Sequence, residues 1–209
     1  MNELYNNNIN EKVNKIISKL DLVEDDELKD LILELIEEYN NLISVIKVDP
    51  LTGAYNRRIL NRIRDYTTIA ICDIDNFKKV NDTFGHVVGD KVLRLVAQTL
   101  IQNSRHNDYV CRFGGDEFVV VFCGASEKSV INRMNAILKN FESITDLEGL
   151  TITLSVGVSC YSDGLSLNEA IEQADKALYA AKNLGKNQVI SYHDIKQKHY
   201  NKSFIKNKR

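Results

Sequence analysis

The segment YVCRFGGDEFVVVFC, residues 109–123, joins two runs of apolar and β-branched residues through Gly114 and Gly115. Such residues favour strands, and a pair of glycines permits the positive φ angles of a tight turn, so the segment predicts a β-hairpin. Another strand is indicated by TIAICDID, residues 68–75, an apolar run that ends in acids. We expect these three strands to lie side by side in one sheet.

Helical and strand-like patterns alternate along the rest of the domain. The predicted helices lie at residues 56–66, 88–102, 129–141 and 167–183, and further strands lie at residues 151–161 and 188–192. This order, with one central hairpin, predicts an α+β fold, in which helices cover the faces of a mostly antiparallel or mixed sheet.

The first 48 residues differ from the rest because they contain no glycine and no proline. A short apolar stripe and an acidic break precede a longer stripe with the four-and-three spacing of a coiled coil. The longer stripe consists of Leu28, Ile32, Leu35, Tyr39, Leu42 and Ile46. We expect residues 1–48 to be a helical segment for dimerisation or regulation, although a helix packed on its own domain has a similar pattern.

The only proline, Pro50, predicts the end of this helix, because proline cannot continue the hydrogen-bond ladder. DPLTG, residues 49–53, is then a turn into a domain that we expect at residues 49–195. Residues 196–209 are basic and rich in polar residues, and we expect a flexible tail.

The composition limits the classes of function. The 209 residues carry 27 Lys and Arg against 29 Asp and Glu, which disfavours a nucleic acid polymer as the main partner. No apolar run approaches the roughly 20 residues of a membrane span, and the N-terminal residues lack the apolar core of a signal peptide. The four cysteines lie in apolar runs, which indicates buried thiols in a reducing compartment. We expect a cytoplasmic protein without a membrane span.

Acidic residues gather where the predicted strands meet. Asp73 and Asp75 end one strand, while Asp116 and Glu117 follow the glycine turn. If the strands are adjacent, one carboxylate from each can reach the same point. Two oxygen ligands that leave positions open for phosphate oxygens suit Mg²⁺, whereas solvated loop acids are the alternative for DxD alone.

Phosphate binding is plausible beside these acids. Phe77 and Lys78 follow the strand at the expected start of a helix, where unpaired N–H groups favour anions. The glycine turn leaves the backbone bare, so a nucleotide could lie against it, although a plain hairpin is the alternative. Asp90 has two explanations, since it either binds a ligand or caps a helix.

Four motifs together resemble the GGDEF-domain diguanylate cyclases over about residues 49–192. They are DPLTGAYNRR from Asp49, FKKVNDTFGHVVGD from Phe77, RFGGDEF from Arg112 and ADKALYAAKNLGKN from Ala174. The resemblance implies the palm-like fold of adenylyl cyclases and nucleotide polymerases. It also implies that two GTP molecules condense to cyclic di-GMP and two pyrophosphates.

The resemblance implies a role for each matching residue. Asp73, the backbone carbonyl of Ile74, Asp116 and Glu117 would hold two Mg²⁺ or Mn²⁺ ions per active site. Asp116 or Glu117 would help to remove the hydroxyl proton. The implied substrate-binding residues are Phe77, Lys78, Asn81, Asp90, Gly114, Gly115, Lys182 and Lys186. Lys186 departs from the arginine common in the family and so lacks its planar fork.

Two further elements are implied. Each domain would supply half of the active site, so the enzyme would be a homodimer. Arg105 and Asp108 form an RxxD sequence with five residues between Asp108 and Gly114, as in the family's inhibitory site for cyclic di-GMP, whereas a surface ion pair is the alternative. The N-terminal helices could also receive an unknown regulatory partner.

Two other functions remain open. One is a non-catalytic receptor for GTP or cyclic di-GMP that signals through protein contacts, and the other is a related cyclase or polymerase with a different nucleotide. The receptor is disfavoured because the implied metal-binding and substrate-binding residues are all kept together, namely Asp73, Asp116, Glu117, Asn81 and Asp90. Equal turnover of ATP and GTP would favour the related cyclase or polymerase.

Overall fold

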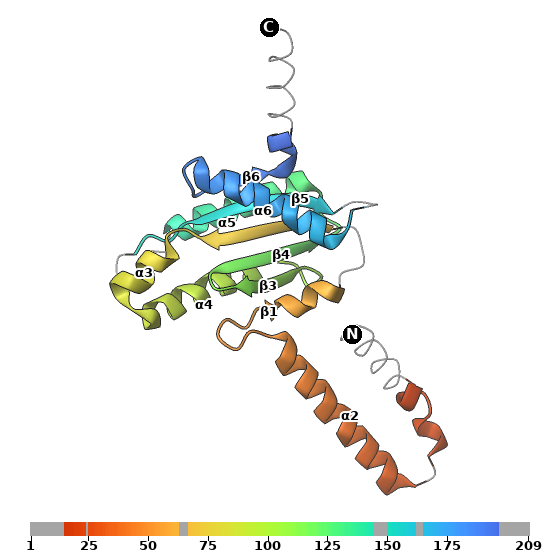
Figure 1. Ribbon diagram of the computed structural model, residues 1–209. Coiled ribbons are helices and arrows are strands. Elements are labelled where there is room, and N and C mark those ends of the chain that lie inside the picture. Colours follow the sequence, from red (N-terminus) through yellow and green to blue (C-terminus); the bar gives the residue numbers. More distant parts are fainter. Residues whose placement is uncertain (1–14, 24, 63–66, 144–149, 162–164, 197–209) are drawn as a thin grey trace. The chain divides into compact units, whose positions relative to one another are not determined.

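The computed structural model describes residues 15–23, 25–62, 67–143, 150–161 and 165–196 (Figure 1). The chain divides into two compact units, an N-terminal unit of residues 1–46 and a C-terminal unit of residues 47–209. No helix among the described residues combines the length and the apolar character that crossing a membrane requires.

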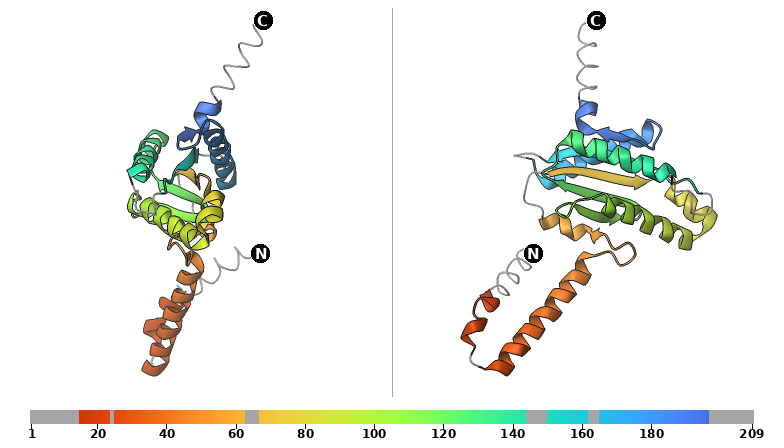
Figure 2. Two further views of the ribbon diagram at one scale, coloured as in Figure 1. Left: turned by 90° about the vertical axis from the view of Figure 1, so that its left-hand side faces the viewer. Right: turned by 180° about the vertical axis from the view of Figure 1, so that it is seen from behind.

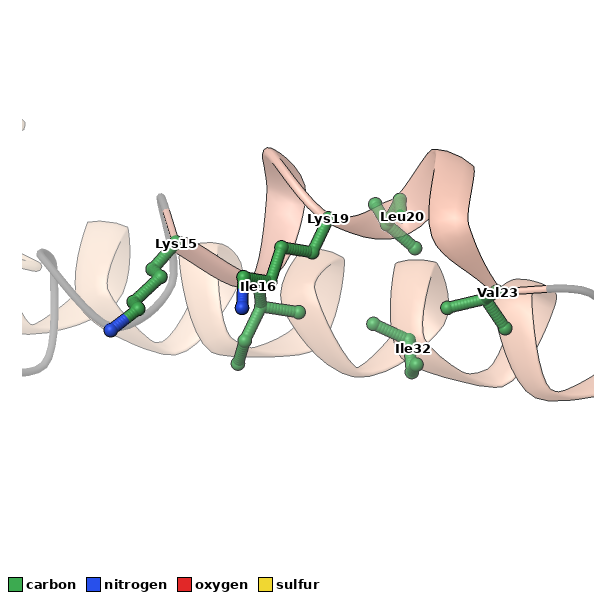
Figure 3. Close-up of a pocket in the computed structure, with 6 residues that line it drawn as sticks. All are labelled: Lys15, Ile16, Lys19, Leu20, Val23 and Ile32. Carbon is green, nitrogen blue, oxygen red and sulfur yellow. The ribbon is translucent and has the colours of Figure 1, made fainter.

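In the N-terminal unit, a short 3-10 helix, Leu20–Leu22, is followed by the long helix α2, Asp26–Lys47. Leu20, Val23 and Ile32 line an apolar groove together with two lysines (Figure 3). Of the predicted stripe, Ile32 is half-buried, whereas Leu28 and Leu35 are 48% and 65% exposed. The side chains of the other three members lie outside the described residues, and dimerisation through the stripe stays a prediction.

The C-terminal unit contains a mixed sheet of six strands within its described residues, in the order β1-β3-β4-β2-β5-β6. The three central pairings are antiparallel, and both edge pairings are parallel. The strands are β1 (Tyr55–Asn56), β2 (Thr67–Ile74), β3 (Tyr109–Gly114), β4 (Glu117–Cys123), β5 (Leu154–Tyr161) and β6 (Val189–Ser191). The α+β prediction is therefore confirmed.

Helices cover both faces of this sheet (Figures 1 and 2). Ala70 and Cys72 of β2 face one core, which includes residues of α4, His86–Gln102, and α5, Glu127–Ser143. Ile69 and Ile71 face the other core with α6, Leu167–Asn183. Because side chains alternate along a strand, Asp73 continues the α6 side of β2.

Helix α6 lies very close to the sheet at Gly157 of β5. A Cβ atom there would lie 2.0 Å from the Ala174 carbonyl oxygen and 2.2 Å from the Leu178 nitrogen. Only glycine admits this approach without a shift of the helix backbone. The close packing fixes the C-terminal half of α6, which carries Lys182, relative to the end of β2.

Three details differ from the sequence-based expectations. The helix expected at residues 56–66 is replaced by β1 and a 3-10 helix, Arg57–Arg62, and residues 63–66 lie outside the described part. Strand β5 begins at Leu154 rather than at residue 151. Cys160 is exposed, because it lies near the end of β5 and not in the interior. The predicted turn at DPLTG is present, with Gly53 at φ 73°.

Candidate active site

Three acids meet where β2 ends and β4 begins, and we call Asp73, Asp116 and Glu117 the acid cluster. Asp73 and Glu117 are direct partners across the antiparallel pair. Asp116 lies in the preceding turn, where its carbonyl oxygen accepts a hydrogen bond from the Ile74 nitrogen at 3.4 Å. The antiparallel register therefore brings acids from two distant segments to one place.

The carboxyl groups of the cluster disfavour one another's charge. Burial raises the pKa of Asp73 above its ordinary value and the charges of Asp116 and Asp75 act in the same direction, whereas Lys182 opposes them. Burial also raises the pKa of Glu117, and the charge of Asp73 adds to that effect. Negative charge is thus concentrated at a half-buried point, which favours a bound cation.

One lysine already lies against the cluster. The Nζ atom of Lys182, on α6, is 2.8 Å from Oδ2 of Asp73. The pair is partly exposed, so Lys182 can exchange a carboxylate partner for an anionic ligand at little cost. The structure thus brings one implied substrate-binding residue, Lys182, to the implied metal ligands.

The donor set fits Mg²⁺ or Mn²⁺. Carboxylate oxygens and the nearby backbone carbonyl of Ile74 are hard ligands of the kind these ions prefer. Among the described residues, no group of three or more His, Cys, Asp and Glu is arranged to hold a metal by itself. A site with few protein ligands is what Mg²⁺ adopts when substrate phosphates complete its coordination.

A second lysine reaches the same end of β2 from the loop after α6. Nζ of Lys186 donates to Oδ1 of Asn76 at 2.6 Å. Asn76 immediately precedes α3, Phe77–Phe84, so Lys186 lies beside the start of that helix. Lys78 is exposed in the first turn of α3. Positive groups from two elements therefore approach the helix N-terminus.

Two of the implied substrate-binding residues, Asn81 and Asp90, lie on α3 and α4. A Cβ atom on Gly89 would lie 1.9 Å from Oδ1 of Asn81 and 3.3 Å from the ring of Phe77. Gly89 thus lets Asn81 and Phe77 lie against α4, directly before Asp90. Asp90 is half-buried in the first part of α4, where its role as a ligand or as part of the helix start stays a prediction.

The predicted hairpin is present, but neither Gly114 nor Gly115 has the positive φ that glycine permits. A Cβ atom on Gly115 would meet nothing within 4 Å, and one on Gly114 would approach only Oε2 of Glu117, at 3.7 Å. Neither the turn nor packing requires glycine here. The remaining physical reason for glycine at these two positions is that the turn then has no side chains and leaves its backbone open to a ligand.

Sequence reasoning missed a brace behind the turn. Nε and Nη2 of Arg112 donate to the Gly115 carbonyl at 3.1 and 2.7 Å, while Nη1 lies 3.1 Å from Oδ1 of Asp49. Although burial acts in the opposite direction, hydrogen bonds from Thr52 and Arg112 hold the pKa of Asp49 below its ordinary value. Asp49 lies in the DPLTGAYNRR motif and Arg112 lies in the RFGGDEF motif, but no local sequence pattern indicates that they pair.

The RxxD residues lie at the other end of β3, roughly 17 Å of strand from the glycine turn. The Asp108 side chain is only 1% exposed and accepts hydrogen bonds from the backbone nitrogens of Arg105 and Cys123. Its ion-pair partner is Arg133 of α5, at 2.9 Å, and not the exposed Arg105. We call Asp108 with these partners the Asp108 site. Nothing in the sequence spacing pointed to Arg133.

Comparisons with known proteins agree with this geometry. Residues 46–188 match the sequence profile of the family described as diguanylate cyclase, GGDEF domain. The diguanylate cyclase DosC of Escherichia coli K12 is 36% identical over an alignment of 174 residues that covers 76% of this chain. The match covers 37% of DosC, so the chain spans little more than a third of that relative.

Two solved structures are similar to most of this chain. The coiled coil and GGDEF domain of DgcB from Caulobacter crescentus, in complex with c-di-GMP, is 29% identical with a TM-score of 0.71 and covers 79% of this chain and 96% of its own. The diguanylate cyclase SiaD from Pseudomonas aeruginosa, in complex with its activator SiaC, is 29% identical with a TM-score of 0.67. That comparison covers 91% of this chain and 78% of SiaD.

Proposed function

Because the chain belongs to the GGDEF diguanylate cyclase family, we propose that it condenses two GTP molecules into cyclic di-GMP and two pyrophosphates. The observation that carries the proposal is the pairing of Asp73 with Glu117 beside Asp116, with the pKa of Asp73 and Glu117 raised. Each 3′-hydroxyl attacks the α-phosphate of the other GTP. A new O–P bond forms and pyrophosphate leaves.

In the proposed site, Asp73, Asp116, Glu117 and the Ile74 carbonyl would hold two Mg²⁺ or Mn²⁺ ions. When bound, the ions neutralise phosphate charge and polarise the reacting phosphate. Asp116 or Glu117 accepts the proton of the attacking hydroxyl.

The cationic side chains bind the triphosphate. Lys182 and Lys186 already lie against Asp73 and Asn76, and Lys78 and Phe77 begin the adjoining helix. These groups arrange the phosphates for in-line attack, and the open turn at Gly114 and Gly115 gives the nucleotide room.

Asn81 and Asp90 select guanine in this proposal. A carboxylate at position 90 accepts hydrogen bonds from guanine N1–H and its exocyclic amine, whereas N1 of adenine carries no proton. A site whose polar groups are left unpaired rejects a ligand, so GTP should be favoured over ATP by about 10²-fold or more.

Because each domain supplies only half of the proposed active site, we propose that the active form is a homodimer. We place it in the cytoplasm, where GTP is supplied. The heptad spacing of α2 supports a stalk that raises the effective concentration of the second domain. DgcB contains a coiled coil before its GGDEF domain, and SiaD binds an activator protein. A regulatory protein at the N-terminal helices is therefore part of the proposal.

We further propose product inhibition at the Asp108 site. Arg105 is exposed and would contact a phosphate or guanine of cyclic di-GMP. The buried Asp108 carboxylate would act indirectly in this site, because it holds the Arg105 backbone and Arg133 in place.

The test is incubation of the purified chain with Mg²⁺ and either GTP or ATP, with the products identified by mass. We expect cyclic di-GMP and pyrophosphate from GTP and at most a trace of product from ATP. Binding of GTP or cyclic di-GMP without turnover would instead support a receptor. Equal turnover of ATP would refute the role of Asp90.

A further inference from the structure

The second acid of the DID sequence has surroundings unlike those of the first. Asp75 is 7% exposed, and its carboxylate accepts three hydrogen bonds. Oγ of Ser155 donates to Oδ1 at 2.7 Å, while Oγ1 of Thr153 and the backbone nitrogen of Asn187 donate to Oδ2 at 2.8 and 3.0 Å. The protein itself therefore satisfies this carboxylate, which leaves it poorly suited to hold a metal.

These bonds tie together three segments of the chain. The Asp75 nitrogen also donates to the Thr153 carbonyl at 2.9 Å, so the end of β2 is fixed to the start of β5 on two sides. The third segment is the loop after α6, which Asp75 reaches across 112 positions of sequence. One buried carboxylate thus fixes that loop to the edge where the acid cluster lies.

The loop needs such an anchor because its backbone is unfavourable. Lys186 and Asn187 have φ angles of 64° and 44°, which residues with a Cβ atom rarely adopt. The Lys186 nitrogen is held by the Ala181 carbonyl, and the Asn187 nitrogen is held by Asp75. In this conformation the Lys186 ammonium group reaches Oδ1 of Asn76, the residue next to Asp75.

We propose that Asp75 is a positioning residue for nucleotide binding: its carboxylate holds the left-handed loop so that Lys186 presents its ammonium group to the triphosphate. The inference rests on the proposed function for the identity of the ligand. Asp75 acts through Lys186 and touches neither metal nor nucleotide.

A double-mutant cycle with Asp75→Asn and Lys186→Ala tests this. The probe is GTP with a methylene group between its α- and β-phosphates, which cannot release pyrophosphate, and its Kd is measured by calorimetry with Mg²⁺. We expect each single variant to bind about tenfold more weakly, and the double variant to bind within about twofold of Lys186→Ala. Additive losses, near a hundredfold in the double variant, would overturn the proposal because Asp75 would then act independently of Lys186.

Milder variants keep the test valid if Asp75→Asn does not fold. Thr153→Val removes one donor to Oδ2, whereas Thr153→Ser keeps the hydroxyl. We expect the valine variant to bind the probe about threefold more weakly than wild type and the serine variant to match wild type. Equal binding by all three proteins would contradict the proposal.

Two controls separate the possible failures. Asp82→Asn removes an exposed acid of α3, and we expect its affinity for the probe to equal that of wild type. If wild type itself does not bind the probe, the proposed function fails. If wild type binds and Asp75→Asn binds equally well, only the positioning role fails.

Discussion

The acid cluster and the Asp108 site lie at opposite ends of β4 and accommodate carboxylate charge in opposite ways. At the Glu117 end, acids face one another, and the pKa of Asp73 and Glu117 is raised. At the Cys123 end, two backbone nitrogens and the Arg133 guanidinium satisfy one buried carboxylate. Charge that the fold leaves poorly compensated indicates a ligand, whereas charge that the fold satisfies indicates a structural role.

The largest effect should come from Asp116→Ala. Removing an oxygen donor from the acid cluster should lower GTP turnover by about 10³-fold or more, because binding of the metal ions depends on few protein ligands. Repulsion among the acids also falls, so the free energy of unfolding should not decrease. Product chromatography measures the turnover and urea unfolding measures the stability, with Asp82→Asn as a charge-matched control. Turnover within tenfold of wild type would contradict the assignment of the acid cluster as the ligand-binding end of β4.

Asp108→Ala should have the opposite effect to Asp116→Ala, because it should lower stability and leave turnover nearly unchanged. The free energy of unfolding should fall by about 3 kcal/mol, because Arg133 loses its partner and two backbone nitrogens lose their acceptor. Initial turnover of the folded fraction, with product absent, should stay within about threefold of wild type, since the chemistry lies at the other end of the strand. Urea unfolding that matches wild type would show that the site is not structural.

Arg105→Ala separates ligand binding from stability at the Asp108 site. Only the backbone of Arg105 bonds Asp108, so the free energy of unfolding should be unchanged. Inhibition of turnover by added cyclic di-GMP should be relieved. Inhibition equal to that of wild type would remove Arg105 from the proposed product site.

Gly115→Ala sharpens the same comparison at the turn. Because a Cβ atom there meets no atom within 4 Å, the free energy of unfolding should stay within about 0.5 kcal/mol of wild type. Turnover should fall about tenfold, because the methyl group occupies space proposed for the nucleotide. The matched control is Gly157→Ala, which should cost about 3 kcal/mol, since its methyl group would meet the α6 backbone.

The smallest effect concerns pH. The pKa of Glu117 is raised on folding, so the folded protein binds this proton more tightly than the unfolded chain does. Its contribution to stability is therefore fully present below about pH 4 and is lost as pH rises through the raised pKa. Glu117→Gln should flatten that part of the stability curve in urea unfolding and reduce turnover. An unchanged slope would refute the shift.

Much of the fold could be predicted because its signals are local. Helix α6 has the predicted bounds, and Ser166 and Glu169 form a capping box that begins it. The helix expected at residues 56–66 is absent because Tyr55 and Asn56 pair with β3, while Ile59 and Leu60 are buried in the core under α6. Tertiary contacts there override an amphipathic pattern.

The site was predictable only where strand pairing determines it. Adjacent antiparallel strands suffice to bring Asp73 toward Glu117. Arg133 with Asp108, Asp49 with Arg112, and Asp75 with Asn187 are 25, 63 and 112 positions apart. No periodicity links such residues, so their roles become visible only in three dimensions.

The central claim, that the acid cluster is a metal–nucleotide site, is tested most directly by ligand-dependent stability. Wild type and Asp116→Ala are unfolded in urea with Mg²⁺ and the methylene analogue of GTP. At about a hundred times its Kd, the analogue should stabilise wild type by about 2.7 kcal/mol and should stabilise Asp116→Ala little or not at all. Equal stabilisation of both proteins, or none of wild type, would contradict the account.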